Sequence, residues 1–328
     1  MQKICNNRDK RNMRVAFVGK GGSGKTTLTA VFCLFLKKSF PVYAIDGDIN
    51  MHLAELLGFE STKASVKHLA DTENAAWIKK YLKGDNQRIE SLESMRKTTP
   101  PGRGSRMITL TKNDQFLQHC AEQNDQMFFS SVGTYEEKDI GASCYHNHLG
   151  VVENILSHTH DVDGWVVMDM VAGIDAFANS LHAQFDVLFL VVEPTRRSVE
   201  VYEQYKDLLR KARSPTTLFV IGNKVATRED KEYLMKNIHG EHFLAVFPLS
   251  NMVRNNDRMG GALVFDESDD VVMDALRVME VTAQKHKVPP QEKLRVLWKL
   301  HEKYVAQRFI TDRFGDLTKQ IDSTFTFS

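Results

Sequence analysis

A glycine-rich stretch near the start of the chain constrains the fold more than any other part of the sequence. It reads Gly-Lys-Gly-Gly-Ser-Gly-Lys-Thr-Thr over residues 19–27. The apolar run 13–18 before it predicts a short strand, and residues 28–38 after it predict a helix. A glycine-rich turn at a helix N-terminus offers bare backbone N–H groups and the positive helix end to an anion. The stretch is therefore predicted to be a phosphate-binding loop.

The spacing within this loop assigns roles to its polar residues. Gly19, four residues and then Gly-Lys-Thr match the nucleotide-binding P-loop pattern. In that pattern the lysine, here Lys25, reaches the β- and γ-phosphates, and the threonine hydroxyl, here Thr26, ligates Mg²⁺. A chance glycine turn is disfavoured, because strand, loop and helix occur in the order that the pattern demands. The residues expected to surround a bound nucleotide are Gly21, Gly22, Ser23, Gly24, Lys25, Thr26 and Thr27.

Lys20 adds a second lysine near the start of the loop, where the ordinary pattern requires no charge. On its own it could be a solvated surface residue. However, residues 20–27 resemble the deviant loop Lys-Gly-Gly-x-Gly-Lys-Thr-Thr of the MinD/ParA superfamily of P-loop ATPases. The resemblance implies that ATP binding joins two copies into a homodimer. It also implies that Lys20 crosses the interface to the phosphates bound by the other copy.

Two acidic residues, Asp46 and Asp48, follow the strand predicted over residues 42–45. Strands of a doubly wound sheet carry their ligands at this end. The two residues could also cap the helix predicted over 51–58, since aspartate favours helix N-termini. By resemblance to the first switch of the superfamily, Asp46 lies near the magnesium shell and Asp48 orients the attacking water. The two interpretations are compatible.

Another acidic strand end occurs at Asp169, after the apolar run 165–168. A buried aspartate without a partner is costly, so a functional role is favoured over a simple helix cap. Residues 169–175 read Asp-Met-Val-Ala-Gly-Ile-Asp and resemble the second switch of the superfamily. The resemblance implies that Asp169 holds the water shell of Mg²⁺. It also implies that Gly173 lets its backbone N–H approach the γ-phosphate.

Two later strand ends are expected to border the base. Asn223 and Lys224 follow the predicted strand 217–222, and Ala226 stands where GTPases carry the aspartate that pairs with guanine. The Asn223 amide can still bond to adenine, as in MinD/ParA relatives, so ATP is favoured over GTP. Pro248 lies at the end of the last predicted strand and leads into the loop beside the base.

A Cys-x-His pair, Cys144 and His146, precedes the predicted helix 149–158. Its spacing is not that of a standard zinc site, and a partly buried cysteine beside surface histidines is the simpler interpretation. Residues 133–156 nevertheless resemble the CooC-type nickel-insertion accessory ATPases of carbon monoxide dehydrogenase, as does the string 193–198. The resemblance implies Ni²⁺ or Zn²⁺ at a dimer interface, bound by this pair. An iron–sulfur cluster, as in the similar nitrogenase iron protein, is not expected, because the second switch carries no cysteine.

The composition argues against several other classes of protein. The chain has 328 residues, a formal net charge of +1 and 42% hydrophobic residues, enough for one large α/β core with extensions. Near-zero net charge argues against bulk affinity for nucleic acid. No apolar run is long enough to span a bilayer, the first residues lack the apolar core of a signal peptide, and the cysteines have no paired spacing. These features predict a cytoplasmic protein.

Three parts are expected along the chain. Residues 1–12 form a tail, residues 13–288 form the ATPase domain, and residues 289–328 form a helical extension. Residues 60–111 are polar and broken, and are predicted to be mostly a surface insertion. The extension is basic and partly amphipathic. Packing against the core or a partner is favoured over membrane contact for it.

Alternating strands and helices with ligands at the strand ends predict a three-layer, doubly wound α/β fold with a mainly parallel sheet. The resemblance implies a Mg²⁺-dependent ATPase that dimerises on binding ATP and resets on hydrolysis. Three roles are open for such a switch. It could serve maturation of a metalloenzyme through an unidentified client protein, or positioning of DNA or a membrane-bound complex, or it could be a non-catalytic, nucleotide-gated binding module.

Overall fold

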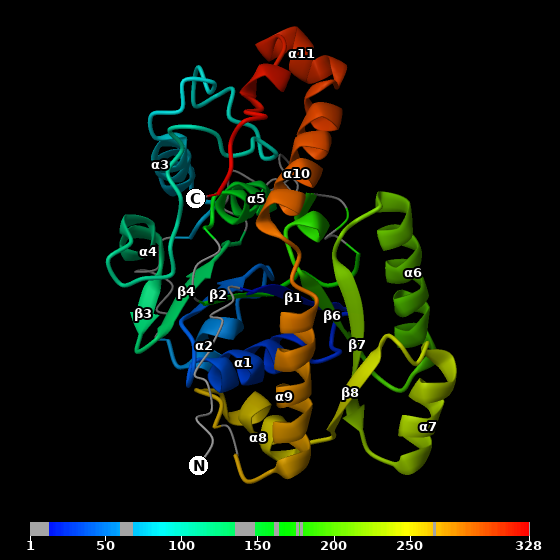
Figure 1. Cartoon of the computed structure of the whole chain (residues 1–328). Coiled ribbons are helices and arrows are strands. Elements are labelled where there is room, and N and C mark those ends of the chain that lie inside the picture. Colours follow the sequence, from blue (N-terminus) through cyan, green and yellow to red (C-terminus); the bar gives the residue numbers. More distant parts are fainter. Residues whose placement is uncertain are drawn as a thin grey trace, which may run out of the picture.

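In the part of the chain that the structure describes, an eight-stranded sheet runs through the molecule in the order β3-β4-β2-β5-β1-β6-β7-β8 (Figure 1). The structure is a computed structural model and describes residues 13–59, 68–134, 148–160, 164–174, 177, 180–264 and 267–327. Paired strands are parallel except β3, which pairs antiparallel with β4 at one edge. The strands are β1 Met13–Gly19, β2 Val42–Asp46, β3 Glu122–Asn124, β4 Met127–Ser131, β5 Trp165–Asp169, β6 Val187–Val192, β7 Thr217–Val225 and β8 Phe243–Pro248.

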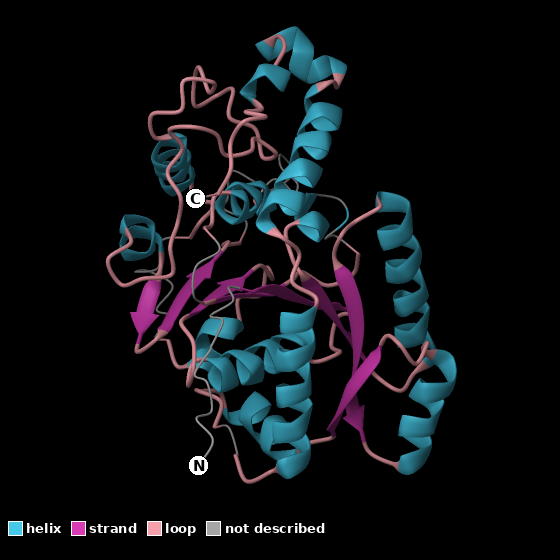
Figure 2. Ribbon diagram, viewed as in Figure 1, coloured by secondary structure: helices cyan, strands magenta, loops and turns pink. Residues whose placement is uncertain are grey.

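Helices cover both faces of this sheet and give the predicted three layers (Figure 2). Side chains of α1, α2 and α9 form the core on one face, and those of α3 to α7 form the core on the other. The helices are α1 Lys25–Leu36, α2 Leu53–Leu57, α3 Thr72–Lys83, α4 Gln115–Cys120, α5 Leu149–Ser157, α6 Arg196–Ala212, α7 Arg228–Asn237, α8 Asn251–Met259, α9 Asp270–Lys285, α10 Pro290–Val305 and α11 Arg308–Phe314. The doubly wound α/β prediction is confirmed.

The central strand β1 shows why these apolar runs become strands rather than helices. All of its residues are buried, as expected for a parallel strand that is covered on both faces. Successive side chains of a strand point to opposite faces. Val15 and Phe17 accordingly enter the core formed with α1, whereas Ala16 and Val18 enter the core formed with α5 and α6.

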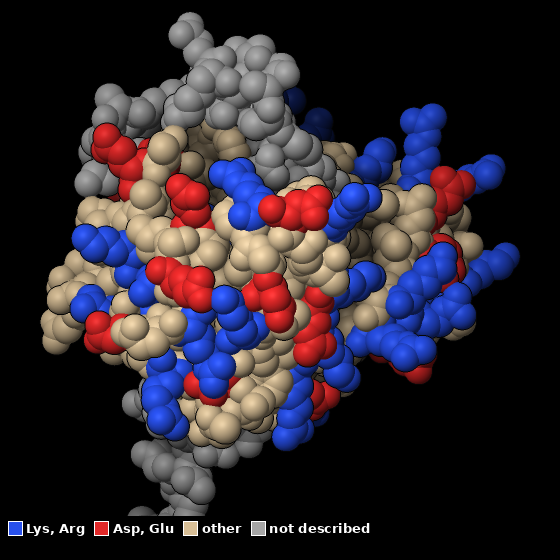
Figure 3. All heavy atoms as spheres, turned by 90° about the horizontal axis from the view of Figure 1, so that it is seen from above, with Lys and Arg blue, Asp and Glu red and all other residues tan. Residues whose placement is uncertain are grey.

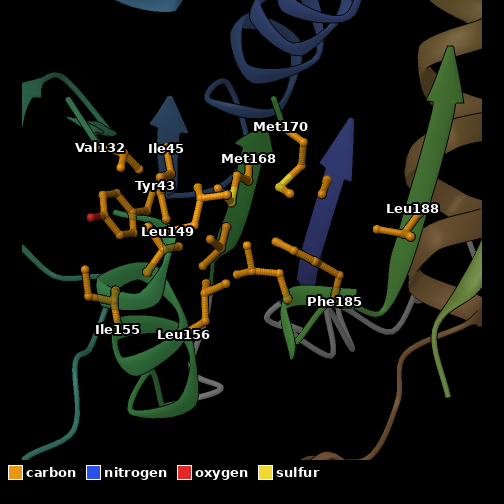
Figure 4. Close-up of a cluster of buried hydrophobic side chains, with 14 of the residues drawn as sticks. Tyr43, Ile45, Val132, Leu149, Ile155, Leu156, Met168, Met170, Phe185 and Leu188 are labelled. Atoms are coloured by element: carbon orange, nitrogen blue, oxygen red, sulfur yellow. The ribbon is translucent and has the colours of Figure 1, made fainter. Parts of the chain in front are cut away.

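The short helix α5 is held by its apolar face (Figure 4). Leu149, Ile155 and Leu156 point toward the sheet, where Tyr43 of β2 and Met168 of β5 lie, and all five side chains are fully buried. Truncating one such side chain to alanine costs about 2–5 kcal/mol of folding free energy. The helix that follows the Cys-x-His segment is therefore firmly attached to the sheet.

The strand register brings the predicted motifs to one edge of the sheet. Asp46 at the end of β2 lies opposite Asp169 at the end of β5. β1 is the other neighbour of β5, with Phe17 opposite Asp169, and its last residue Gly19 begins the glycine-rich loop. Parallel strands thus place residues from three distant parts of the chain at one carboxyl edge, as doubly wound sheets do at their ligand sites.

The prediction that residues 60–111 are mostly surface is wrong for their second half. Ile89, Met95 and Thr99 are buried there. The cause is the C-terminal segment, which packs on this region: the Thr99 hydroxyl donates to Gln320 Oε1 at 2.9 Å. The polar stretch around Thr99 was predicted to be solvated because Gln320, which covers it, lies more than two hundred residues later in the chain. Local sequence pattern does not reveal a contact at such a distance.

The amphipathic helix α10 turns its apolar face inward and rises beside α5 (Figure 1). Leu294 and Leu297 are buried, and Lys293 forms a buried ion pair with Asp186, with Nζ and Oδ1 2.6 Å apart. The apolar face is therefore used in packing against the rest of the chain, the favoured alternative. Among the helices described, none has both the length and the apolar character needed to cross a membrane.

Charges of both signs are interspersed over much of the face seen from above, and basic side chains gather on the side of that view where α6 lies (Figure 3). Several basic residues of α6 are paired along the helix. The Lys206 Nζ atom lies 2.7 Å from Glu203 Oε2. Arg210 Nη2 and Lys211 Nζ each lie 2.6 Å from a carboxylate oxygen of Asp207. Paired surface charges give a weaker field than a bare basic stripe, in keeping with the near-zero net charge.

Candidate functional site

The glycine-rich loop adopts a conformation that requires glycine at two positions. Gly24 has φ 91°, and a Cβ there would lie 2.3 Å from Asn223 Nδ2. Gly19 has φ 145°, and a Cβ there would lie 2.6 Å from the Val191 carbonyl oxygen. Helix α1 begins directly after Gly24, three residues earlier than predicted. The loop therefore opens onto a helix N-terminus, the arrangement that binds phosphate.

Residues near the carboxyl end of β7 brace this loop. Asn223 Nδ2 donates to the Ser23 carbonyl at 2.8 Å, and Lys224 Nζ donates to the Gly22 carbonyl at 2.6 Å. Lys224 also pairs with Glu193, 2.9 Å away. Two loop carbonyls are thus directed at β7 rather than at an anion. This role of Glu193 was not predicted from the sequence. The only indication there was the resemblance of residues 193–198 to the CooC-type ATPases.

The two lysines of the loop lie close together. Lys25 is buried, and its Nζ donates to the Lys20 carbonyl at 3.4 Å. Lys20 itself is half-buried at the start of the loop. Contact of Lys20 with a second copy stays a prediction, because the structure describes one chain.

The residues predicted to hold Mg²⁺ converge beside the loop. The Thr26 hydroxyl donates to Asp169 Oδ2 at 2.6 Å, and Asp46 is the register neighbour of Asp169. The Asp46 carboxylate accepts the backbone N–H groups of Asp48 and Leu53, each at 3.0 Å. Leu53 is the first residue of α2. Asp46 therefore also accepts a backbone N–H at the start of this helix, in line with the alternative interpretation that Asp46 caps it.

Burial raises the pKa of both carboxyl groups. It is the largest cause for each group, and it raises the pKa of Asp169 to about 7 and that of Asp46 well above its usual range. The Asp169 charge adds to the rise for Asp46. Each carboxylate is thus held where its negative charge is poorly solvated, and a nearby cation would stabilise both.

A hydrated Mg²⁺ fits these residues. Asp169 Oδ1 is buried and has no hydrogen-bond partner among the described residues. An unsatisfied buried acceptor is costly, and an ion with its waters would satisfy it. The described residues contain no group of three or more His, Cys, Asp or Glu that could hold a metal by themselves. Mg²⁺ suits such a sparse site, because it keeps several waters and takes few protein ligands besides phosphate oxygens.

Asp48 lies beside this site in a fixed orientation. Its Oδ1 accepts the backbone N–H of Asn50 at 3.0 Å and the Asn50 side-chain amide at 2.9 Å. Asp48 is half-buried and lines the same cavity as the glycine-rich loop. With one oxygen held by Asn50, the direction of the other oxygen is set.

A cavity of about 410 Å³ connects the loop to the end of β8. Its volume lies within the range of about 300–1,000 Å³ that is usual for small-molecule sites. Pro248, which was predicted to border the base, lines this cavity, and several neighbours that were not predicted lie with it. The lining residues from the end of β8 and from the α8 and α9 region are Phe247, Pro248, Leu249, Ser250, Met252, Val253, Arg254, Asp257, Asp269 and Val272. Local pattern could not find these residues, because their helices are brought to the cavity only by folding.

The second switch differs from expectation in one contact. The Gly173 N–H, expected to approach the γ-phosphate, donates to the Gly19 carbonyl at 3.0 Å. The Gly173 carbonyl accepts a hydrogen bond from the Tyr205 hydroxyl of α6 at 2.5 Å. Sequence analysis did not single out Tyr205. The candidate metal pair Cys144 and His146 lies outside the described residues.

A phosphate loop, two buried carboxylates and an adjoining, mostly apolar cavity define a nucleotide-binding α/β protein. The chain belongs to the CobQ/CobB/MinD/ParA nucleotide binding domain (CbiA) family, whose profile matches residues 15–260. It is a nucleotide-binding protein of the MinD/ParA type and is similar to CooC. The family relationship suggested by the loop and both switches is thereby confirmed.

Individual relatives cover most of the chain. An uncharacterized ATP-binding protein of Methanocaldococcus jannaschii is 26% identical over 265 residues, which is 79% of this chain and 98% of that protein. The carbon monoxide dehydrogenase accessory protein CooC of Rhodospirillum rubrum is 24% identical over 251 residues, which is 76% of this chain and 88% of CooC.

Solved structures share the fold at low sequence identity. The cell division ATPase MinD of Pyrococcus furiosus has a TM-score of 0.52 and 17% identity, with 82% of this chain and 99% of MinD covered. An ATP complex of Cyanothece McdA has a TM-score of 0.53 and 14% identity, with 84% of this chain and 98% of McdA covered. These likenesses support the fold.

Proposed function

We propose that this protein binds Mg·ATP in the cavity, hydrolyses it slowly and acts as a homodimeric switch. The observation that carries the proposal is the Asp169 carboxylate beside the glycine-rich loop. One of its oxygens accepts from the Thr26 hydroxyl at 2.6 Å, and the other is buried without a partner among the described residues. A phosphate loop that lines the cavity and an electrostatically incomplete acidic site thus adjoin each other through Thr26.

The residues of the chain supply binding, orientation and charge. The loop N–H groups and Lys25 hold the phosphates, and Lys20 from a second copy adds a further positive charge. Mg²⁺, when bound, neutralises charge that develops on the phosphate oxygens. Asp48, held by Asn50, orients the attacking water. Phosphoryl transfer needs such positioning and charge neutralisation more than covalent participation by the protein.

The Asn223 amide favours adenine over guanine. One N–H of the amide donates to the Ser23 carbonyl at 2.8 Å, which fixes the orientation of the group and lets its oxygen accept from a base. An oxygen accepts from the amino group of adenine but faces the O6 acceptor of guanine unfavourably. Ala226 offers no carboxylate to bind guanine. We therefore infer that the physiological nucleotide is ATP.

For the role of the switch, we favour maturation of a metalloenzyme. The support is the relationship to CooC, which is named as a carbon monoxide dehydrogenase accessory protein, together with the Cys-x-His pair of the sequence. In this role Cys144 and His146 hold Ni²⁺ or Zn²⁺ between two copies. Hydrolysis then separates the copies and releases the metal to a client protein.

Nucleotide chemistry is tested first, by measuring the affinity for Mg·ATP and Mg·GTP and the rate of phosphate release. Wild type should bind ATP more tightly than GTP, and Asp48→Asn should keep the binding and lose most of the turnover. Failure of wild type to bind Mg·ATP would refute the proposed function. Tight binding without turnover in wild type would instead favour a nucleotide-gated binding module.

The metal role is tested by titrating Ni²⁺ and Zn²⁺ into the ATP-loaded dimer. Binding should be lost in Cys144→Ala and retained in the matched control Cys5→Ala. Equal loss in both variants, or no binding in wild type, counts against the metal role. ATP-dependent co-sedimentation with DNA or liposomes would then favour a positioning role.

A further inference from the structure

Gly173 in the second switch is held at both of its polar backbone groups. Its N–H donates to the Gly19 carbonyl of the phosphate loop at 3.0 Å. Its carbonyl accepts from the Tyr205 hydroxyl at 2.5 Å. We call these two hydrogen bonds the Gly173 latch.

Tyr205 is itself immobilised by the core. It lies in the middle of α6, and its side chain is fully buried. Its ring packs edge-on against Phe177, with ring centroids 5.3 Å apart and an interplanar angle of 68°. Phe177 also stacks on His182 at a centroid distance of 5.2 Å. The Tyr205 side chain therefore makes two contacts with the chain near the second switch. Its hydroxyl bonds to Gly173, and its ring packs on Phe177.

If the Gly173 N–H serves the γ-phosphate, as the resemblance to the second switch implies, the latch and a bound γ-phosphate compete for the same donor. A backbone N–H makes one strong hydrogen bond, so Gly173 cannot serve the Gly19 carbonyl and a phosphate oxygen equally well. Gly173 has φ 96°, and a Cβ there would meet nothing within 4 Å, so no described atom crowds this side of the glycine. The step that engages a triphosphate must therefore break the contact with Gly19.

We propose that Tyr205 is a positioning residue that holds the second switch in its resting state and so sets how strongly the protein prefers a triphosphate to a diphosphate. The inference rests on the proposed function, because it assumes a nucleotide in the cavity. Tyr205 does not line the cavity, whereas Ala172, the neighbour of Gly173, does, so Tyr205 acts through the Gly173 backbone and not on the nucleotide. The hydroxyl stabilises the state in which the Gly173 N–H is occupied, and a γ-phosphate must displace that state.

Tyr205→Phe removes the hydroxyl and keeps the ring. A matched control lies three residues earlier on the same helix: Tyr202 is also fully buried, and its hydroxyl lies 2.8 Å from His242 Nδ1. The same hydroxyl accepts the backbone N–H of His239 at 3.4 Å, so Tyr202→Phe removes hydrogen bonds of α6 that do not touch the switch. Thermal unfolding of both variants first establishes that each is folded.

The first measurement is the affinity for Mg·ATPγS and Mg·ADP. In Tyr205→Phe the ratio of ATPγS affinity to ADP affinity should rise roughly fivefold, the effect expected of one lost hydrogen bond, while ADP affinity stays unchanged. Tyr202→Phe should leave the ratio as in wild type. An unchanged or lower ratio in Tyr205→Phe, or an equal rise in both variants, would overturn the proposal.

The second measurement needs no nucleotide and separates this inference from the proposed function. Amide hydrogen exchange of a peptide covering residues 169–174 should be roughly fivefold faster in Tyr205→Phe than in wild type or Tyr202→Phe. Unchanged exchange in nucleotide-free protein shows that the latch does not exist. Faster exchange together with failure of wild type to bind either nucleotide shows that the latch is real and that the proposed ATP site, with the role given to Tyr205 in it, is wrong.

Discussion

The substitution Asp169→Asn tests the interpretation of the buried acidic site. Burial raises the pKa of Asp169 to about 7, from a usual value of about 3.9. Each pKa unit corresponds to about 1.4 kcal/mol, so ionised Asp169 destabilises the folded, nucleotide-free chain by up to roughly 4 kcal/mol above neutral pH. Asparagine has nearly the same shape, can accept the Thr26 hydroxyl and carries no charge. We expect the variant to be more stable than wild type by about 2–4 kcal/mol at pH 8.

The assay is urea unfolding at pH 8, followed by tryptophan fluorescence, with and without Mg·ATP. Mg·ATP should stabilise wild type strongly and Asp169→Asn little, because the variant has lost the charge that attracts the ion. A variant less stable than wild type in the absence of nucleotide would refute the reasoning, since it would mean that the carboxylate charge is already compensated within the chain.

Asp186→Asn is the matched control, with the opposite expected sign. Asp186 is as deeply buried as Asp169, but it lies 2.6 Å from Lys293 Nζ and accepts the backbone N–H groups of Arg14 and Val288 at 2.8 and 2.9 Å. Removing one partner of a buried ion pair typically costs about 3–5 kcal/mol. The same chemical change should therefore stabilise the chain at one buried aspartate and destabilise it at the other.

Three further predictions follow from the geometry. Gly24→Ala places a methyl group 2.3 Å from Asn223 Nδ2, so it should abolish measurable ATP binding by calorimetry while the circular dichroism spectrum stays that of a folded α/β protein. Lys20→Ala should keep ATP binding and lose the ATP-dependent dimer, as measured by light scattering. A dimer that persists in this variant would show that Lys20 does not reach across the interface to the phosphates of the second copy. Burial raises the pKa of Glu153 from 4.5 to about 7. Between these two pH values the folded state binds more protons than the unfolded state, so the free energy of unfolding should fall as the pH rises from 4.5 to about 7. Glu153→Gln should flatten this part of the stability profile, and an unchanged slope would contradict the assignment.

The phosphate site was readable from sequence because its chemistry is local. The loop over residues 19–27 carries its own glycines, lysines and helix start within one short stretch, and the spacing alone dictates where the N–H groups point. The ends of apolar runs were equally informative. Asp46 and Asp169 each close a strand that is buried on both faces, and parallel strands end at one edge.

Tertiary structure decided which distant side chains complete the site. One end of the cavity comes from β8, α8 and α9, and the contact between Tyr205 and Gly173 joins residues 32 positions apart. The C-terminal segment buries Thr99 beneath Gln320, although the neighbourhood of Thr99 was predicted to be surface. Periodicity reveals that a face will be buried, but not what will cover it, because the covering partner is chosen by packing of the whole chain and not by any local propensity.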